Sequence, residues 1–247
     1  KQAQAKITQL RYSMRKRHKT SHQSLQVRLD DLLEYEPITR GQEVTYQAWD
    51  DDYNLVLTGS AGTGKTFMGM YLGLEQVLDP TTEQERLVIV RSMVPTRDMG
   101  FLPGTKEEKE DVFLSPYKNI ANELFGDGNS YNRAVTAKKI EFQSTSFIRG
   151  LTLDNCVILV DEMQNMNFHE LDSVITRVGK NCRIIFAGDY LQSDFKFKDE
   201  KDGIMKFLTI VEQLKKFEVI TFGWEDIVRS DFVRDYIMTK EMLGITT

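Results

Sequence analysis

The sequence has little cysteine and histidine and no long apolar run, and each absence narrows the class of protein. No apolar stretch among the 247 residues approaches the roughly 18 residues that a membrane-spanning helix needs, so no such span is expected. The three histidines are scattered and none lies in a cluster with metal-ligand spacing, so we expect no zinc site. The two cysteines, Cys156 and Cys182, each flank an apolar run. We therefore predict unpaired thiols in a cytoplasmic protein.

Charge is spread unevenly along the chain. Residues 1–28 hold eight Lys or Arg and no Asp or Glu, whereas the whole chain has a net charge of −5, which leaves −13 on the remainder. A basic arm on an acidic body is typical of contact with nucleic acid. A solvated tail, or an arm that docks on a neighbouring subunit, would have the same composition. The sequence alone leaves these alternatives open.

Beyond the arm, short apolar runs alternate with amphipathic stretches. The pattern predicts strands at residues 55–58, 87–91, 140–143, 157–161, 183–187 and 219–222, and helices at residues 65–78, 168–177, 204–214 and 231–242. Such alternation indicates an α/β fold, a mainly parallel sheet with helices on both faces. We expect one domain over residues 29–247. Residues 92–132 hold three of the five prolines, and we expect a loop-rich insertion there.

One motif carries the chemistry most directly. Residues 59–66 read GSAGTGKT between a predicted strand and a predicted helix, which is a complete phosphate-binding loop in the context that supports it. Glycines let backbone N–H groups turn towards a phosphate, and the helix adds its positive N-terminal end. Lys65 is expected to contact the β- and γ-phosphates, and Thr66 to offer its hydroxyl to Mg²⁺. The predicted nucleotide contacts are Gly59, Ser60, Ala61, Gly62, Thr63, Gly64, Lys65 and Thr66.

Acidic and amide side chains follow two other predicted strands. Asp161 and Glu162 end the buried run CVILV; Asp161 would hold Mg²⁺, and Glu162 would orient and deprotonate the attacking water. Asp189 and Gln192 follow the run RIIFA, and Gln192 could respond to the γ-phosphate. Upstream, Gln42 has the donor and acceptor that suit adenine. No Asn-Lys-x-Asp guanine motif occurs, which favours ATP over GTP.

These motifs together resemble the PhoH family of P-loop ATPases, which is related to the core of superfamily-one helicases. The resemblance runs from about residue 37 to residue 240. Besides the phosphate loop, it rests on residues 160–165 (VDEMQN, with Met163 where the family has Ala), 188–192 (GDYLQ), 100–104 (GFLPG), 147–150 (FIRG) and 226–229 (DIVR). The resemblance implies a RecA-like domain with ATPase activity and a suggested RNA or DNA helicase-like or nuclease-linked activity, often in a ring.

Some residues depart from the family pattern. Leu151 stands where the family has an Arg, which puts one phosphate or nucleic-acid contact in doubt. Residues 91–94 read RSMV, which differs from the R-P-x-V that is usual in the family. The basic arm has no counterpart in the pattern, and a short single-domain form with such an arm would suit a phage-encoded member. Only one RecA-like domain fits the chain. An arginine that reaches the γ-phosphate must then come from the C-terminal segment or another subunit, and Arg229 is the first candidate, with Arg149 second.

The sequence therefore predicts a Mg²⁺-dependent ATPase that acts on single-stranded RNA or DNA, as a homo-oligomer for which a hexameric ring is the first candidate. The alternative is an ATP-dependent switch or assembly factor that acts on proteins without unwinding. A module that binds nucleotide without hydrolysis is disfavoured by Glu162.

Overall fold

A six-stranded, all-parallel sheet forms the centre of the computed structural model, which describes residues 27–92, 106–189 and 198–245. The strand order is β3-β2-β4-β5-β1-β6. The strands are β1 (Asn54–Gly59), β2 (Arg86–Arg91), β3 (Ile140–Ser144), β4 (Cys156–Val160), β5 (Arg183–Ala187) and β6 (Phe217–Phe222). All six lie where the apolar runs predict them. Because every pair is parallel, the carboxyl ends of all the strands meet at one edge of the sheet.

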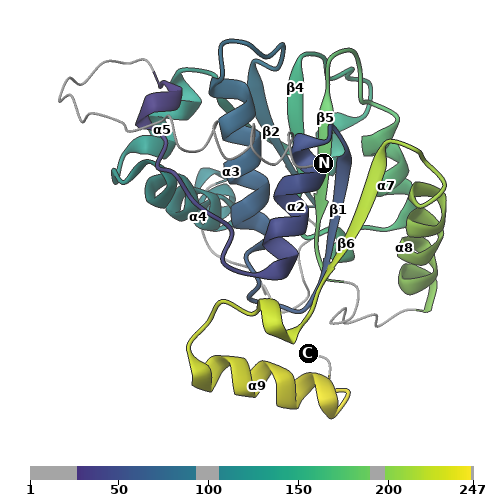
Figure 1. Cartoon of the computed structure of the whole chain (residues 1–247). Helices are drawn as coiled ribbons and strands as arrows, with labels where there is room; N and C mark the ends of the chain where they lie inside the picture. Colours follow the sequence, from purple (N-terminus) through teal and green to yellow (C-terminus); the bar gives the residue numbers. More distant parts are fainter. Residues whose placement is uncertain (1–26, 93–105, 190–197, 246–247) are drawn as a thin grey trace.

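Helices cover both faces of the sheet, as predicted for this fold class (Figure 1). One face packs against α2 (Arg40–Asp50), α3 (Lys65–Leu78), α4 (Lys106–Phe125) and α5 (Ser130–Thr136); the other packs against α6 (Thr145–Ile148), α7 (Phe168–Ile175) and α8 (Lys198–Val211). Strands between two helical layers are buried on both sides, which explains their continuous apolar runs. The architecture is that of a single RecA-like domain.

Helix α3, which follows the phosphate loop, lies unusually close to the sheet. Gly69 and Gly73 are one helical turn apart on its inner face, and a Cβ added at either would lie 2.6 Å from a methyl group of Leu159 or Leu87. Hydrogen atoms at these two positions therefore let the helix approach strands β4 and β2. This packing holds the beginning of α3 at the carboxyl edge, next to the loop.

The segment that we expected to be loop-rich, residues 92–132, is largely helical where the structure describes it. Helix α4 occupies 20 residues of it, with Pro116 inside the helix, and α5 begins at Ser130. The expectation gave too much weight to proline. A proline inside a helix costs one backbone hydrogen bond, but the buried side chains of Tyr117, Ala121 and Leu124 anchor α4 to the core.

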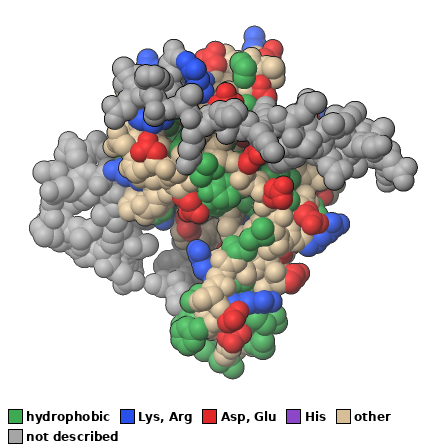
Figure 2. All heavy atoms as spheres, turned by 60° about the vertical axis from the view of Figure 1, so that its left-hand side comes forward, with side chains coloured by type: hydrophobic (Ala, Val, Ile, Leu, Met, Phe, Trp, Pro, Cys, Tyr) green, Lys and Arg blue, Asp and Glu red, His purple; other side chains and the backbone are tan. Residues whose placement is uncertain are grey.

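Helix α9 (Asp231–Met242) lies apart from the two helical layers, below the carboxyl edge of the sheet in Figure 1. The short η3 turn (Trp224–Asp226) lies between β6 and α9, and no residue of α9 is fully buried. Hydrophobic side chains gather at this end of the molecule in Figure 2. Those of the α9 region include Phe232, Tyr236, Met242 and Leu243. Within the described ranges, no helix is both long enough and apolar enough to cross a membrane.

Candidate active site

The phosphate loop lies at the carboxyl edge, between the end of β1 and the start of α3. Its glycines adopt backbone conformations that other residues rarely reach, with φ of +111° at Gly59, +75° at Gly62 and +87° at Gly64. A Cβ at Gly59 would also lie 2.1 Å from the carbonyl oxygen of Phe222 on β6. The glycine spacing is thus required by the fold of the loop, which also brings the N-terminus of α3 to the position where an anion would bind.

Lys65 reaches back over the loop from the first turn of α3. Its Nζ donates to the carbonyl oxygens of Ser60 at 2.7 Å and Gly59 at 3.1 Å, and to Thr63 Oγ1 at 3.3 Å. Burial lowers the pKa of this ammonium group, and the carboxylates of Asp189, Glu162, Asp161 and Glu241 oppose the shift. A cation inside a cradle of N–H groups suits a polyphosphate ligand.

Thr66 and Asp161 meet although 95 residues separate them in the sequence. The Thr66 hydroxyl donates to Asp161 Oδ1 at 2.8 Å, and the buried Tyr117 hydroxyl donates to Asp161 Oδ2 at 2.8 Å. Burial raises the pKa of Asp161 to about 6, the charge of Glu162 contributes to the rise, and the two hydroxyl donors oppose it. Two oxygen side chains that meet beside a phosphate loop have the donor chemistry that Mg²⁺ prefers.

Glu162 lies in the left-handed region, with φ of +53°. A residue other than glycine in this conformation is strained, and such strain is concentrated at functional sites. The Gln164 amide donates to the Glu162 carboxylate, and its Oε1 accepts from the backbone N–H of Asp189 at 3.1 Å. Gln164 therefore links the acids that follow β4 to the turn that follows β5.

Gln42 lies beside the phosphate loop, in the first turn of α2. Its amide donates to the Thr63 carbonyl at 3.5 Å and accepts from the Ile38 N–H at 2.9 Å. The buried Asp226 carboxylate holds the beginning of α2 against the end of β6, because it accepts from Gly41 N at 2.7 Å and from Gly223 N at 2.9 Å. Beyond its bonds to Thr63 and Ile38, the amide of Gln42 keeps one hydrogen and one lone pair.

Arg229 lies against the phosphate loop of its own chain. A Cβ at Gly62 would be 3.0 Å from Arg229 Cγ and 3.5 Å from its Nε, and the neighbouring Val228 N–H donates to the Gly62 carbonyl at 3.0 Å. The second arginine candidate, Arg149, is not near the loop by topology. It follows β3, and β2, β4 and β5 lie between that strand and β1.

Helix α9 adds a carboxylate that the sequence gave no reason to expect. The Ser60 hydroxyl donates to Glu241 Oε2 at 3.0 Å, and the Trp224 indole N–H donates to the same oxygen. Glu241 is 181 residues from Ser60 in the chain. No local motif marks it, and none marks Tyr117. Asp226 does have a signal, since it begins the DIVR segment, in which the sequence points to the arginine.

Asp189 and Gln192 are the last of the predicted site residues. Gln192 lies outside the described residues, as do residues 100–104. Asp189 is buried at the carboxyl end of β5, within the electrostatic reach of Lys65. In the described ranges, no group of three or more His, Cys, Asp and Glu side chains could hold a metal ion. The thiols of Cys156 and Cys182 form no disulfide, and their sulfurs lie 3.5 Å apart at the opposite edge of the sheet from the phosphate loop.

The fold and this arrangement of loop, lysine and strand-end acids define an ATPase domain of the P-loop class. Residues 34–240 match the family model described as PhoH-like protein. The chain therefore belongs to the PhoH-like family, as its motifs indicated.

Several known proteins share this similarity. The chain is 32% identical to a PhoH-like protein of Synechocystis over 74% of its own length and 55% of that protein. It is 34% identical to protein PhoH2 of Bacillus subtilis over 67% of its length and 38% of the relative, and 30% identical to protein PhoH of Escherichia coli over 70% and 49%. The chain thus spans about half the length of these relatives, or less.

Solved structures resemble the domain more distantly. The large terminase of a thermophilic bacteriophage is 13% identical, with a TM-score of 0.46 over 81% of this chain and 50% of that one. A Bacteroides Pif1 helicase in complex with ADP-AlF3 and single-stranded DNA is also 13% identical, with a TM-score of 0.40 over 86% and 48%.

Proposed function

We propose that this domain hydrolyses ATP with Mg²⁺ and couples hydrolysis to single-stranded nucleic acid, as a homo-oligomer in the cytoplasm. In this proposal the nucleotide lies along residues 59–66, with Lys65 against the β- and γ-phosphates. Gln42 contacts the adenine through the hydrogen and lone pair that its protein contacts leave over. The meeting of the phosphate loop with Asp161 and Glu162 at one sheet edge is the observation that carries the hydrolytic part.

Thr66 and Asp161 would hold the metal ion, since their oxygens lie 2.8 Å apart at the start of α3. Mg²⁺ is commonly held by one or two protein oxygens together with phosphates and water, so this small donor set fits. A Mg²⁺ ion held there would supply positive charge against the phosphates. Tyr117 keeps the Asp161 carboxylate oriented towards Thr66.

Glu162 would orient and deprotonate the attacking water, held by Gln164 in its strained conformation. Asp189 and Gln192 would border the γ-phosphate from β5. Arg229, already beside Gly62, would stabilise the transferring phosphoryl group. Its position favours action within one chain, whereas the trans finger considered from the sequence requires a rearranged C-terminal segment.

Two substitutions test the hydrolytic assignment. Lys65→Ala should abolish nucleotide binding, and Glu162→Gln should bind ATP yet lose turnover by roughly two to four orders of magnitude. Equilibrium binding of a fluorescent ATP analogue and phosphate release measure the two steps. Glu212→Gln, on an exposed position just after α8, is the matched control and should behave as wild type. Wild-type hydrolysis in Glu162→Gln would refute its role as the base.

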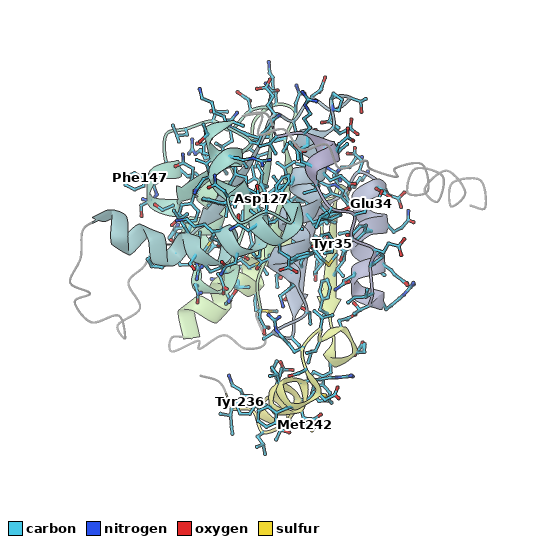
Figure 3. The ribbon with its side chains drawn as sticks, turned by 90° about the vertical axis from the view of Figure 1, so that its left-hand side faces the viewer. Glu34, Tyr35, Asp127, Phe147, Tyr236 and Met242 are labelled. Atoms are coloured by element: carbon cyan, nitrogen blue, oxygen red, sulfur yellow. The ribbon has the colours of Figure 1, made fainter. Side chains whose placement is uncertain are left out.

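One exposed pair supports the nucleic-acid part. Phe147 is 64% exposed just after β3, and the exposed Arg149 follows two residues later at the same carboxyl edge that carries the phosphate loop. Figure 3 shows Phe147 on the outside of the molecule, well away from α9. An exposed aromatic ring beside an arginine can stack on a base and contact the phosphate backbone, without preference for sequence. The basic arm, residues 1–28, would add non-specific attraction to the backbone.

ATPase rates with and without single-stranded RNA and DNA test this coupling. Phe147→Ala should lower nucleic-acid affinity by about 10-fold or more, since stacking contributes roughly 1–3 kcal/mol per base, and Phe147→Trp should retain it. Deletion of residues 1–28 should flatten the dependence of affinity on salt. An unchanged salt slope would assign the arm to a subunit contact instead. An ATPase rate that ignores both nucleic acids would favour the alternative function, a switch or assembly factor for proteins.

The outer face of α9 supports assembly. Figure 3 shows Tyr236 and Met242 pointing away from the body of the domain, and both are 62% exposed. Exposed apolar patches of this kind mark interaction surfaces, and we assign this one to a second copy of the chain, in a ring with six subunits as the first model. Light scattering should report an oligomer, and Tyr236→Lys should reduce its mass. Mixtures of Lys65→Ala and Arg229→Ala chains test a trans arginine, because only a trans arrangement restores activity.

A further inference from the structure

Helix α9 turns one narrow face towards the phosphate loop. Four of its half-buried side chains, Arg234, Ile237, Met238 and Glu241, follow the i, i+3, i+4, i+7 spacing of a single helical face. Ile237 lies against Gly62, since a Cβ there would be 3.5 Å from its Cδ1. The loop and the C-terminal helix are therefore in direct contact.

Glu241 is the acidic residue of this face, and it lies beside Ser60 of the phosphate loop. Its carboxylate accepts from the Ser60 hydroxyl at 3.0 Å, and the Ser60 carbonyl lies 2.7 Å from Lys65 Nζ. The Lys65 ammonium is the group that contacts β- and γ-phosphates in this class of loop. Glu241 is thus near the end of the cradle where the terminal phosphates of ATP would lie, and its charge acts on Lys65.

A carboxylate at this position opposes the ligand. It stabilises the Lys65 cation when it is close, and it repels a polyphosphate that approaches the same cation, because like charges in a partly buried site interact more strongly than in water. The γ-phosphate adds charge at the Lys65 end, so ATP should meet more repulsion than ADP. The hydroxyl of Ser60 and the indole of Trp224, which both donate to Glu241, are neutral groups.

We propose that Glu241 is a specificity-determining residue of the phosphate loop, because its carboxylate disfavours nucleotides that have a γ-phosphate. ATP then binds only when this carboxylate moves away, and α9, which carries Glu241, shifts from the loop. The contacts with Ser60 and Trp224 then break together. Because α9 also carries the exposed apolar face, the position of that face depends on whether ATP is bound. The inference rests on the proposed nucleotide binding at this loop.

Binding of a non-hydrolysable ATP analogue and of ADP, each with Mg²⁺, tests the proposal on the full chain. Glu241→Gln removes the charge and keeps the shape, and it should bind the ATP analogue about 10-fold more tightly, with a smaller gain for ADP. Asp235→Asn is the matched control, since it removes one charge from an exposed position of the same helix, and it should bind both ligands as wild type does. Equal gains in both variants would reduce the effect to net charge and overturn the proposal.

Weaker ATP binding by Glu241→Gln would also overturn it, because Glu241 would then support the nucleotide. Lys65→Ala separates this inference from the assignment of the site: if that variant binds normally, the nucleotide site itself is wrong. If Lys65→Ala loses binding while Glu241→Gln matches wild type, only the role of Glu241 fails.

The indole of Trp224 reports the movement without any change at Glu241. The chain has two tryptophans, and the emission of wild type minus that of Trp224→Phe isolates Trp224. Saturation with the ATP analogue should change this difference, because the indole loses its carboxylate partner. ADP should change it less. An unchanged difference at saturation would show that Glu241 and Trp224 stay together, and would refute the shift of α9.

Discussion

Replacement of Asp226 by Asn should destabilise the domain far more than the corresponding substitution at a neighbouring surface position. The Asp226 carboxylate is 3% exposed, and each oxygen accepts one backbone N–H, from Gly41 at 2.7 Å and from Gly223 at 2.9 Å. Asn keeps the size of the side chain, so no cavity forms. It supplies one oxygen only, and its NH₂ group would face the second N–H donor.

The expected cost follows from these two bonds. Hydrogen bonds to a charged group contribute about 1.5–3 kcal/mol each, and a buried donor without an acceptor costs about 1–3 kcal/mol. One weakened bond and one unsatisfied donor together lower the free energy of unfolding by about 2–4 kcal/mol. For a domain of this size, that is a fall in Tm of about 5–15 °C.

Urea unfolding followed by circular dichroism measures the change directly. Glu225→Gln, at the exposed adjacent position, is the control and should change the free energy of unfolding by less than about 0.5 kcal/mol. Because Asp226 joins the start of α2 to the turn before Arg229, Asp226→Asn should also raise the KM for ATP. An unfolding free energy equal to that of the control would refute the argument, since it would mean that the N–H groups of Gly41 and Gly223 find other acceptors.

Two further predictions concern groups with shifted pKa values. Tyr117→Phe removes a donor that stabilises the charged form of Asp161, so the pKa of Asp161 should rise beyond about 6 and the acid side of the pH–rate profile for ATP hydrolysis should move to higher pH; an unmoved profile would contradict the role of the Tyr117 hydroxyl. The sulfurs of Cys156 and Cys182 lie 3.5 Å apart, and this contact lowers the pKa of the half-buried Cys182 to about 6, while the same contact and burial raise the pKa of Cys156. Mass spectrometry after brief treatment with iodoacetamide at pH 7 should therefore find Cys182 modified and Cys156 intact, and the reverse order would refute the opposite directions of the two pKa shifts.

Features that depend on residues close together in the sequence could be predicted from the sequence. The phosphate loop, the six strands and helices α3 and α9 follow from glycine spacing and from the period of the apolar residues. Helix α2 was missed because Gly41 and a run of mixed polar residues hide its periodicity. Helix α4 was missed because Pro116 suggests a break, while the contacts that stabilise the helix come from the core.

The sequence by itself determined which residues gather at the carboxyl edge, because Lys65, Thr66 and the acids Asp161 and Glu162 belong to short motifs that follow parallel strands, and such strands end at one sheet edge. Only the tertiary structure decided what surrounds them. Tyr117 reaches Asp161 across 44 residues, Asp226 reaches Gly41 across 185, and Glu241 reaches Ser60 across 181. Such partners meet through the packing of whole helices and strands, and no local pattern records which side chains that packing brings together.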